Sequence, residues 1–496
     1  MSTKVCLVLS ERTIEKNLAL AKKYKNYIDL VELRADFLNQ NEILFLRNFP
    51  QAVDLPAILT VRRKADGGNF TGGEGARMTI FARGLAYAEE DSSKNFAYID
   101  LENDFEAPGI EEAAYASGIK IIRSLHTKKN ADDIATTVKN ICHCVTDIPK
   151  LAFMTTSLKN TAEIFKAAKQ LSGIKYIITA MGQYGINSRI LSAKIGSEIV
   201  YTFSSEYIER KNEQKNLIDP ITLHTKYGFS DINENTKIYG VTGKDVYGSL
   251  SPQIHNKGFQ TKKINAVYIP VSASSAKEAL KFADTVGMQG LSVTAPFKTD
   301  IISEITQISP TSQSIGAVNT LILENNKWFG YNTDVDGFKQ ALSEFLKTQK
   351  LTFYKVAIIG AGGAAKAVAH VIKSMHGKAC IFNRTAENAK LLANQYSFKW
   401  AILDPINIKQ LSAYSDLIVQ TTNAGMEPNT KTDPLNFYTF TGKEKIFELI
   451  YRPEETVLLK RAKEAGCQVC NGYKMLEYQA HHQFKIFTGV DYEQNN

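Results

Sequence analysis

Eight short apolar runs in the first 228 residues constrain the fold of this chain more than any other feature. Segments of helix length separate them, so strand and helix patterns alternate throughout this part. Eight strands that alternate with helices make up a (β/α)8 barrel, in which functional side chains follow the carboxyl ends of the strands. We therefore expect such a barrel over residues 1–228. Its strands are expected at residues 4–9, 27–33, 57–61, 96–101, 120–125, 150–154, 175–180 and 199–203.

A second α/β region follows a polar stretch, residues 229–237, which we interpret as a linker. A strand-like run opens this region at Ile238. From Tyr354 the order is strand, glycine loop, helix and strand, which is typical of a dinucleotide-binding fold. We expect an α/β substrate domain over residues 238–350 and a Rossmann-type nucleotide domain over residues 351–475. A C-terminal helix, residues 476–496, is expected to return to the substrate domain.

Charge and composition exclude several classes of partner. The net charge is +8, from 59 Lys and Arg against 51 Asp and Glu, but it is scattered and forms no basic stripe, so we expect no nucleic-acid partner. No apolar run approaches the ~20 residues of a membrane span, and the N-terminus lacks a signal-peptide pattern. Six dispersed cysteines favour a reducing compartment, and we expect the cytoplasm. Cys467 and Cys470 have CxxC spacing without a second pair, so no metal site is predicted.

A glycine loop predicts nucleotide binding. Residues 360–365, Gly-Ala-Gly-Gly-Ala-Ala, lie between an apolar strand and a helix, where small residues let the backbone approach a pyrophosphate. The next strand ends in Asn383-Arg384-Thr385, where an NAD site usually offers Asp or Glu. A guanidinium and a hydroxyl suit a 2′-phosphate, which favours NADP. The alternative is that Arg384 is an ordinary surface residue.

Four polar signatures precede the glycine loop, at residues 249–255, 292–298, 316–320 and 331–334. Their hydroxyls, lysine, asparagine and aspartate can hold a small polyol. Lys298 and Asp334 could relay the proton that accompanies hydride transfer. Lysine–aspartate pairs are also commonly solvated ion pairs, so spacing alone leaves both interpretations open.

Together with residues 383–385, 421–426 and 471–479, these motifs resemble shikimate dehydrogenase in order and spacing from about residue 238 to 490. The resemblance implies that Lys298 and Asp334 are the catalytic pair. A preference for quinate remains an alternative, because one extra hydroxyl separates the two acids. The resemblance also implies shikimate contacts from Ser249, Ser251, Thr294, Asn319 and Gln479. It implies NADP contacts from Gly360, Ala361, Gly362, Gly363, Ala364, Ala365, Asn383, Arg384, Thr385 and Gly472.

The expected barrel carries a lysine, Lys150, in an apolar strand. Such a lysine is costly unless it is neutral, paired or functional. Burial lowers the pKa of a lysine in general, and a neutral amine can form a Schiff base with a ketone. A histidine in reach, such as His126, could then take the adjacent proton and return it to a leaving hydroxyl. The alternatives are a snorkelling lysine at a strand edge and a capped loop histidine, and residue types alone do not decide.

Residues 1–228 resemble type I 3-dehydroquinate dehydratase. The resemblance implies that Lys150 is the Schiff-base lysine and His126 the general acid and base. It implies substrate contacts from Glu32, Arg34, Arg62 and Arg189, the last through the substrate carboxylate, and a weaker contact from Ser10.

One segment departs from the family pattern. A Ser-x-Pro-Gly-Gln-like loop usually closes the site, but residues 204–215 offer only Gln214. The two resemblances together imply a bifunctional shikimate-pathway enzyme whose substrates are 3-dehydroquinate, 3-dehydroshikimate and shikimate. The alternatives are a shikimate dehydrogenase with an impaired barrel and a non-catalytic metabolite sensor built from the same modules.

Overall fold

The computed structural model describes residues 3–86, 91–128, 133–213 and 216–492. The chain divides into two compact units. The first comprises Met1–Gly240, Asp245–Ser274 and Glu278–Met288, and the second comprises Val241–Lys244, Ser275–Lys277 and Gln289–Asn496. The segment expected as the substrate domain is therefore shared between both units.

A sheet of eight parallel strands forms the centre of the first unit, in the order β7-β6-β5-β4-β3-β2-β1-β8. Its two end strands are joined where they begin, because the N–H of Glu198 donates to the carbonyl of Tyr176 at 2.8 Å. The expected (β/α)8 fold is confirmed, and every strand overlaps its predicted position. The strands are β1 (Lys4–Leu9), β2 (Leu30–Arg34), β3 (Ala57–Thr60), β4 (Tyr98–Glu102), β5 (Lys120–Thr127), β6 (Ile148–Met154), β7 (Ile177–Met181) and β8 (Ile199–Thr202).

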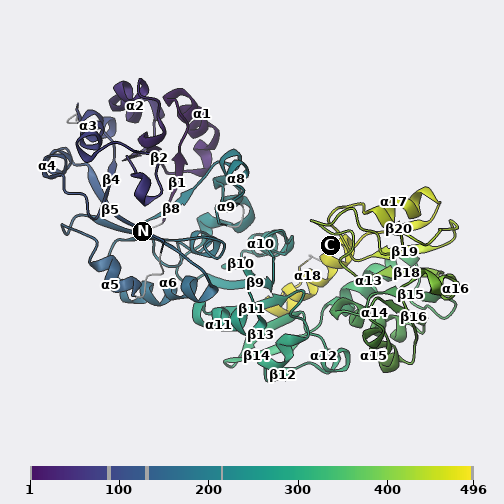
Figure 1. The fold of residues 1–496 in the computed structure, drawn as a ribbon. Helices are drawn as coiled ribbons and strands as arrows, with labels where there is room; N and C mark the ends of the chain where they lie inside the picture. The colour runs from purple at the N-terminus through teal and green to yellow at the C-terminus, as the bar shows by residue number, and fades with distance from the viewer. Residues whose placement is uncertain (1–2, 87–90, 129–132, 214–215, 493–496) are drawn as a thin grey trace. The chain divides into compact units, whose positions relative to one another are not determined.

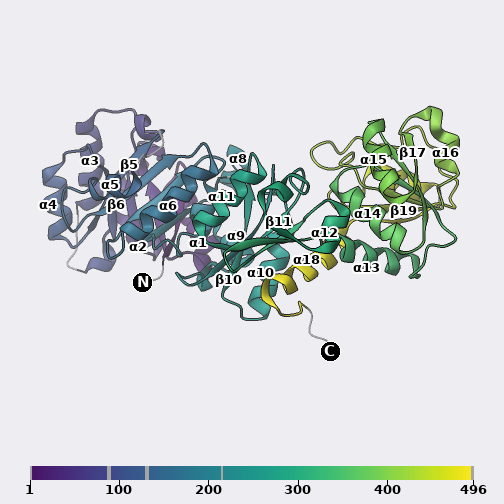
Figure 2. The ribbon, with the colours of Figure 1, turned by 90° about the horizontal axis from the view of Figure 1, so that it is seen from below.

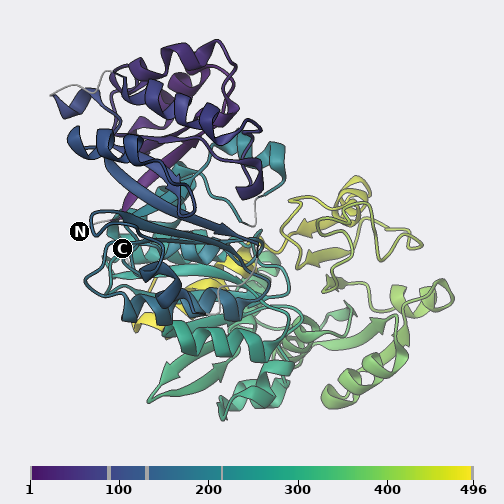
Figure 3. The same ribbon diagram turned by 60° about the vertical axis from the view of Figure 1, so that its left-hand side comes forward.

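Helices lie outside these strands, as two views of the purple and blue part of the ribbon show (Figure 1, Figure 3). Their starts are written in the sequence: the Thr13 hydroxyl accepts from an N–H in the first turn of α1, and Ser157 and Asn160 form a capping box at α6. The helices are α1 (Ile14–Tyr24), α2 (Phe49–Val53), α3 (Glu74–Leu85), α4 (Pro108–Ala116), α5 (Ile134–Lys139), α6 (Leu158–Gln170), α7 (Ile186–Ile190), α8 (Ser205–Lys211) and α9 (Pro220–Tyr227).

The interior of the barrel changes from apolar to polar along its strands. Alternate residues of a barrel strand face inward, so inward positions are two residues apart. One buried apolar cluster contains Cys6, Val8, Leu30, Ile58, Tyr98, Ile122, Ile148, Ile177, Ile199 and Tyr201. Two residues further along five of these strands stand Glu32, Thr60, Asp100, Ser124 and Lys150, all buried. The strand period therefore places a polar layer directly beyond the apolar one.

The first unit also holds most of the segment that follows the barrel. It includes α10 (Ser251–Thr261), β10 (Ala266–Ser272), and most of β9 (Lys237–Gly243) and α11 (Ala276–Val286). The Tyr247 hydroxyl donates to the carbonyl of Gln183, and the N–H of Leu158 donates to Glu278 at 3.2 Å. These contacts attach residues 245–288 to the barrel.

The second unit contains strands in the order β11-β13-β14-β12, with antiparallel pairing except between β12 and β14. The register places Thr320 of β13 opposite both Ser292 and Tyr331. The polar signatures at these strand ends thereby lie next to one another at the same end of the sheet. The elements are β11 (Met288–Val293), β12 (Gln307–Ile308), α12 (Pro310–Ile315), β13 (Thr320–Glu324), β14 (Lys327–Tyr331) and α13 (Asp334–Leu346).

A six-stranded parallel sheet completes the second unit, in the order β17-β16-β15-β18-β19-β20. This is the doubly wound order, whose direction reverses between β15 and β18, where such folds bind nucleotides. Helices α13, α14, α15 and α18 share the core on one face, with α13 and α14 neighbours (Figure 2). The elements are β15 (Lys355–Ile359), α14 (Gly363–Ser374), β16 (Lys378–Asn383), α15 (Ala386–Tyr396), β17 (Lys399–Ile402), α16 (Ile408–Ser412), β18 (Leu417–Gln420), β19 (Lys445–Glu448), α17 (Val457–Glu464), β20 (Gln468–Cys470) and α18 (Tyr473–Thr488).

Candidate active sites

The predicted Schiff-base lysine lies inside the barrel. Strand β6 begins at Ile148, so Lys150 is its third residue and does not open the strand as expected. Its side chain is buried, and its amine donates to Asp100 at 2.8 Å. The carboxylate of Glu32 lies 3.6 Å from the same nitrogen, and the ring centre of Tyr201 lies 3.9 Å away. The lysine is therefore paired and held against an aromatic face, which excludes the snorkelling alternative.

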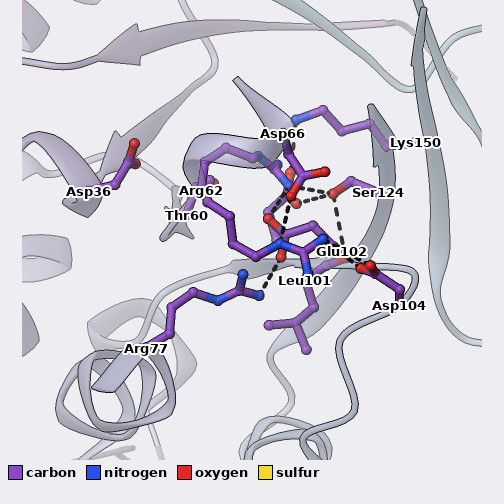
Figure 4. Close-up of polar contacts among 12 residues, drawn as sticks. Asp36, Thr60, Arg62, Asp66, Arg77, Leu101, Glu102, Asp104, Ser124 and Lys150 are labelled. Atoms are coloured by element: carbon purple, nitrogen blue, oxygen red, sulfur yellow. Dashed lines mark hydrogen bonds and ion pairs between the residues drawn. The ribbon is translucent and has the colours of Figure 1, made fainter. Parts of the chain in front are cut away.

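Arg62 joins Asp100, the partner of Lys150, to a second carboxylate, Glu102 (Figure 4). Its Nη2 donates to Asp100 at 2.7 Å, and its Nη1 donates to Glu102 at 2.7 Å and to Ser124 at 2.9 Å. Burial by itself would raise the pKa of Asp100, but Arg62 and Lys150 outweigh it and hold that pKa well below its usual range. Asp100 is therefore a fixed anion between two cations.

His126 is the penultimate residue of β5 and faces the same interior. Burial lowers its pKa well below 6.5, and the charges of Arg62 and Lys150 add to this effect while Asp100 opposes it. Its Nδ1 has no hydrogen-bond partner among the residues that the structure describes. A neutral imidazole with a free ring nitrogen can accept a proton, as the predicted acid–base role requires.

The two candidate arginines outside this cluster differ in their partners. Arg189, on α7, is buried, and it donates to the carbonyls of Asn216 and Tyr201, each at 2.9 Å. Burial lowers its pKa to about 10. Arg34 instead binds Asp36 through two hydrogen bonds of 2.9 and 2.8 Å. Among the described residues, Arg189 therefore has only carbonyl hydrogen-bond partners, whereas the charge of Arg34 is paired with that of Asp36.

The remaining barrel candidates are less defined. Ser10 is half-buried and follows β1 directly. Gln214 lies outside the described residues. Sequence reasoning missed other members of the site, although the alternation Tyr98-Ile-Asp100-Leu-Glu102 carried the signal of polar side chains at inward positions. The missed residues are Asp36, Asp100, Glu102, Ser124 and Tyr201.

In the second unit, the predicted catalytic pair is in direct contact. Asp334 is the first residue of α13, and the Lys298 amine donates to its Oδ2 at 2.6 Å. The Asn319 amide donates to Oδ1 of the same carboxylate at 2.9 Å. Asp334 is 4% exposed, while the Lys298 side chain keeps 16% of its surface. The lysine can therefore meet a substrate while the aspartate holds it.

Asn319 is in turn held from both strands and helix. Its Oδ1 accepts from the N–H of Thr333 at 2.8 Å and from the Thr320 hydroxyl at 2.7 Å. Gln479 of α18 accepts from its Nδ2 at 3.4 Å, and Gln483 donates to its main-chain carbonyl at 3.1 Å. The structure thus brings Lys298, Asp334, Asn319 and Gln479 together, as predicted from their separate motifs. Sequence reasoning missed Gln483, while Thr320 and Thr333 lay within the polar signatures but were given no individual role.

The other predicted shikimate contacts are placed in different units. Ser249 and Ser251 belong to the first unit, where the Ser249 hydroxyl accepts from the N–H of Ser251 at 3.2 Å. Ser251 begins α10. Thr294 belongs to the second unit, is half-buried, and donates its N–H to Thr242 at 2.8 Å.

The glycine loop forms a cradle at the carboxyl end of β15. Gly360 has φ +111°, and a Cβ there would lie 2.5 Å from the Thr421 hydroxyl, so no other residue fits. Gly362 precedes the first turn of α14, and a Cβ there would meet nothing within 4 Å. A Cβ on Gly363 would lie 3.3 Å from Cβ of Lys298. This open helix N-terminus fits a pyrophosphate and lies beside Lys298, the predicted catalytic lysine.

The end of β16 fits the phosphate of NADP. The Asn383 amide donates to the carbonyl of Thr385 at 2.9 Å and fixes the turn. Arg384 and Thr385 are both exposed, and no carboxylate stands among residues 383–386. Gly472 has a separate explanation, since a Cβ there would lie 2.0 Å from the carbonyl oxygen of Leu449. Its predicted contact with the cofactor stays a prediction.

No helix in the described ranges is long and apolar enough to cross a membrane.

Comparisons with known proteins match families to both halves of the chain. Residues 5–211 match the type I 3-dehydroquinase family, residues 241–321 the shikimate dehydrogenase substrate-binding domain, and residues 343–432 the shikimate/quinate 5-dehydrogenase family. A shikimate dehydrogenase (NADP(+)) of Methanococcus aeolicus is 37% identical over 265 residues, covering 52% of this chain and 94% of that protein.

Two further relatives span nearly the whole chain. A chloroplastic bifunctional 3-dehydroquinate dehydratase/shikimate dehydrogenase of Arabidopsis thaliana is 29% identical over 98% of this chain and 82% of its own length. A solved dehydroquinate dehydratase and shikimate dehydrogenase from S. pombe is 20% identical over 99% of this chain and 96% of its own, with a TM-score of 0.42. The chain belongs to the shikimate dehydrogenase family and joins to that enzyme, in one polypeptide, a type I 3-dehydroquinase.

Proposed function

We propose that the barrel dehydrates 3-dehydroquinate to 3-dehydroshikimate and that the second unit reduces this product to shikimate. The observation that carries the proposal is a lysine hydrogen-bonded to a buried aspartate in each half, at 2.8 Å for Lys150 and 2.6 Å for Lys298. Each lysine lies where its family motif predicts the chemistry. The product of one half is the substrate of the other.

In the barrel, neutral Lys150 attacks the C3 ketone, and loss of water leaves an imine. The imine draws electrons from the neighbouring C–H bond, whose proton passes to His126. The same histidine returns a proton to the C1 hydroxyl, which leaves as water, and hydrolysis of the imine frees Lys150. Arg189 would bind the substrate carboxylate, because its described partners are neutral carbonyls. Arg34, Glu32 and Arg62 would position the substrate or the lysine.

In the second unit, the ketone oxygen becomes a hydroxyl and needs a proton. NADPH, when bound, supplies the hydride. Lys298 donates the proton to the oxygen, Asp334 orients the ammonium group, and a proton from water restores it. Asn319 and Gln479 would hold substrate hydroxyls, and Thr294 a further polar group of the substrate. The shikimate contacts of Ser249 and Ser251 stay predictions from their motif. Arg384 and Thr385 would bind the 2′-phosphate that distinguishes NADP from NAD.

The two alternatives predict different losses. A barrel impaired by its unusual segment, residues 204–215, would leave only the dehydrogenase. A loop was expected there, but residues 205–211 form the helix α8. A metabolite sensor would need neither lysine, yet both lysines and His126 are present in these contacts. The bifunctional enzyme therefore accounts for more of the structure. All six cysteines are unpaired thiols, which supports a reducing compartment, and we propose the cytoplasm.

The test is NADPH oxidation by the purified full chain with 3-dehydroquinate as the only carbon substrate. Oxidation is expected, because reduction must wait for dehydration. Oxidation only after addition of 3-dehydroshikimate would show a failed barrel and direct attention to residues 204–215. No oxidation with either substrate would contradict the proposed enzymatic activities and favour the metabolite sensor. The Lys150→Ala variant is then assayed with 3-dehydroquinate alone. Because this variant cannot dehydrate its substrate, any NADPH oxidation would show direct reduction of 3-dehydroquinate to quinate.

A further inference from the structure

A second arginine, Arg77, touches the barrel's charge cluster from outside the sheet. It lies on α3, has no exposed surface, and stacks its guanidinium 3.9 Å above the ring centre of Phe105. Its Nη2 donates to Oε2 of Glu102, and Glu74 lies 3.3 Å from its Nε. Figure 4 shows the side chain extending from its helix toward Glu102. Burial of a cation costs desolvation free energy, which the ion pair between Arg77 and Glu102 must offset.

Arg77 ends a chain of alternating charges that reaches the reactive lysine. Glu102 gives one oxygen to Arg77 and the other to Arg62, at 2.7 Å. Arg62 gives its other nitrogen to Asp100 at 2.7 Å, and Asp100 gives its second oxygen to Lys150 at 2.8 Å. Each carboxylate therefore has both oxygens occupied, and neither can turn toward one neighbour without leaving another.

We propose that Arg77 is a positioning residue for imine formation, which holds Glu102 so that Arg62 stays bound to Asp100 and thereby limits how strongly Asp100 retains the Lys150 ammonium group. The inference rests on the proposed dehydratase function. It extends that function to a residue that touches neither the lysine nor, by its position behind Glu102, the substrate.

Removal of Arg77 has a predictable direction. Glu102 would be left with one unpaired buried oxygen, and Arg62 would turn toward it and away from Asp100. The cluster would also lose one positive charge in a medium of low dielectric constant. Both changes favour the charged form of Lys150, so imine formation would need a higher pH. Removal of the Glu102 charge has the opposite effect, because Arg62 would then bind Asp100 alone.

Other groups also face Lys150 and are kept constant in this comparison. They come from the strands around the interior and are Cys6, Glu32, Asp100, His126 and Tyr201, with Arg34 and Arg62 at the strand ends.

The experiment traps the imine in the full chain with 3-dehydroquinate and cyanoborohydride, and follows the adduct by intact mass across pH. Arg77→Met is expected to move the half-maximal pH of trapping upward by about one unit, roughly tenfold slower trapping on the acid side. Arg77→Lys, which keeps the charge, should return the half-maximal pH most of the way to that of the unmodified chain. Glu102→Gln should move the half-maximal pH downward. Arg83→Gln, which removes an exposed charge from the same helix, should leave it unchanged.

The outcomes separate the inference from the proposed function. Coincident pH profiles for Arg77→Met and the unmodified chain, or a lower yield at every pH without a shift, would overturn the positioning role. If Arg77→Met does not fold, as judged by circular dichroism, an unshifted or upward-shifted Glu102→Gln profile overturns it instead. Absence of any adduct in the unmodified chain would contradict the proposed imine chemistry itself.

Discussion

Both halves place a lysine against a buried aspartate, but the surroundings of the two pairs differ. Lys150 is enclosed in a cluster of charges, with Asp100, Glu32 and Arg62 around it. Lys298 is 16% exposed, and its Asp334 is held by the amide of Asn319. The difference matches the chemistry proposed for each. A nucleophile must lose its proton before it reacts, whereas a proton donor must keep its proton until the substrate arrives.

The comparison also separates two ways to bury a carboxyl group. Asp100 lies between cations, and its pKa is held well below its usual range despite burial. Glu448, at the end of β19 in the second unit, accepts from the Thr456 hydroxyl and from the Gln420 amide at 3.3 Å. Burial raises its pKa to about 7, and these neutral donors only partly oppose the shift. The same functional group is an anion in one half and close to half-protonated at neutral pH in the other.

Exchange of each lysine for alanine is expected to have the largest effect on the two activities. Lys150→Ala is expected to reduce dehydration by about 10³-fold or more while sparing reduction, and Lys298→Ala to do the reverse, because each removes the reacting group of one site. Separate assays with 3-dehydroquinate and with 3-dehydroshikimate plus NADPH measure this. Equal loss of both activities in either variant would contradict the division of labour.

An Asp→Asn change in each half should show whether the aspartate acts through its negative charge or only as a hydrogen-bond acceptor. Asp100→Asn leaves two buried cations without their anion, and we expect a loss of about 3 kcal/mol in barrel stability together with dehydratase activity. Asp334→Asn keeps a hydrogen-bond acceptor for Lys298, and we expect about 100-fold slower reduction with little change in stability. Denaturant unfolding and the two rates test both. A stable Asp100→Asn barrel would show that its charges are not coupled as described.

Glu448 predicts that stability of the second unit depends on pH in the direction opposite to an ordinary ion-paired acid. The pKa of Glu448 is about 7 in the folded protein, and its ordinary value, expected in the unfolded chain, is 4.5. Between these two pH values only the folded state holds the proton. Stability is therefore greatest at low pH and falls as pH rises toward 7, by at most about 3 kcal/mol. Unfolding of Glu448→Gln followed at pH 5.5 and 7.5 should lose this dependence, whereas Glu464→Gln, an exposed control, should keep it. An unchanged pH dependence in Glu448→Gln would refute the assignment.

The smallest effect is expected at the exposed phosphate site. Arg384→Gln should raise the KM for NADPH about tenfold and leave the KM for NADH unchanged, because only the 2′-phosphate loses a charged partner. The effect should shrink at high salt, unlike the effects within the buried barrel cluster. Lys390→Gln, an exposed charge on α15, serves as the matched control. An equal rise in the KM for NADPH and the KM for NADH would show that Arg384 does not bind the 2′-phosphate.

Much of the fold could be predicted because it is encoded locally. Every barrel strand was found from its apolar run, and the nucleotide fold from one strand, one loop and one helix start. The errors of position inside the site were small, since β6 starts at Ile148 and not at Lys150, and β2 starts at Leu30 and not at Tyr27. Strand ends are set by hydrogen bonds to neighbouring strands, which an apolar pattern does not contain. The C-terminal helix likewise begins at Tyr473, three residues before its expected start.

The sequence by itself determined which strands and loops this protein forms, which side chains share a face, and which motifs carry its lysines. Only the tertiary structure decided which charges meet. Lys150 of β6 faces Glu32 of β2 and Tyr201 of β8, which are not its neighbours in the sheet, across the closed interior of the barrel. In the second unit, Asn319 meets Gln479, 160 positions away in the chain. Periodicity fixes the direction of a side chain within one element, whereas a contact across the interior depends on how whole elements close around a core.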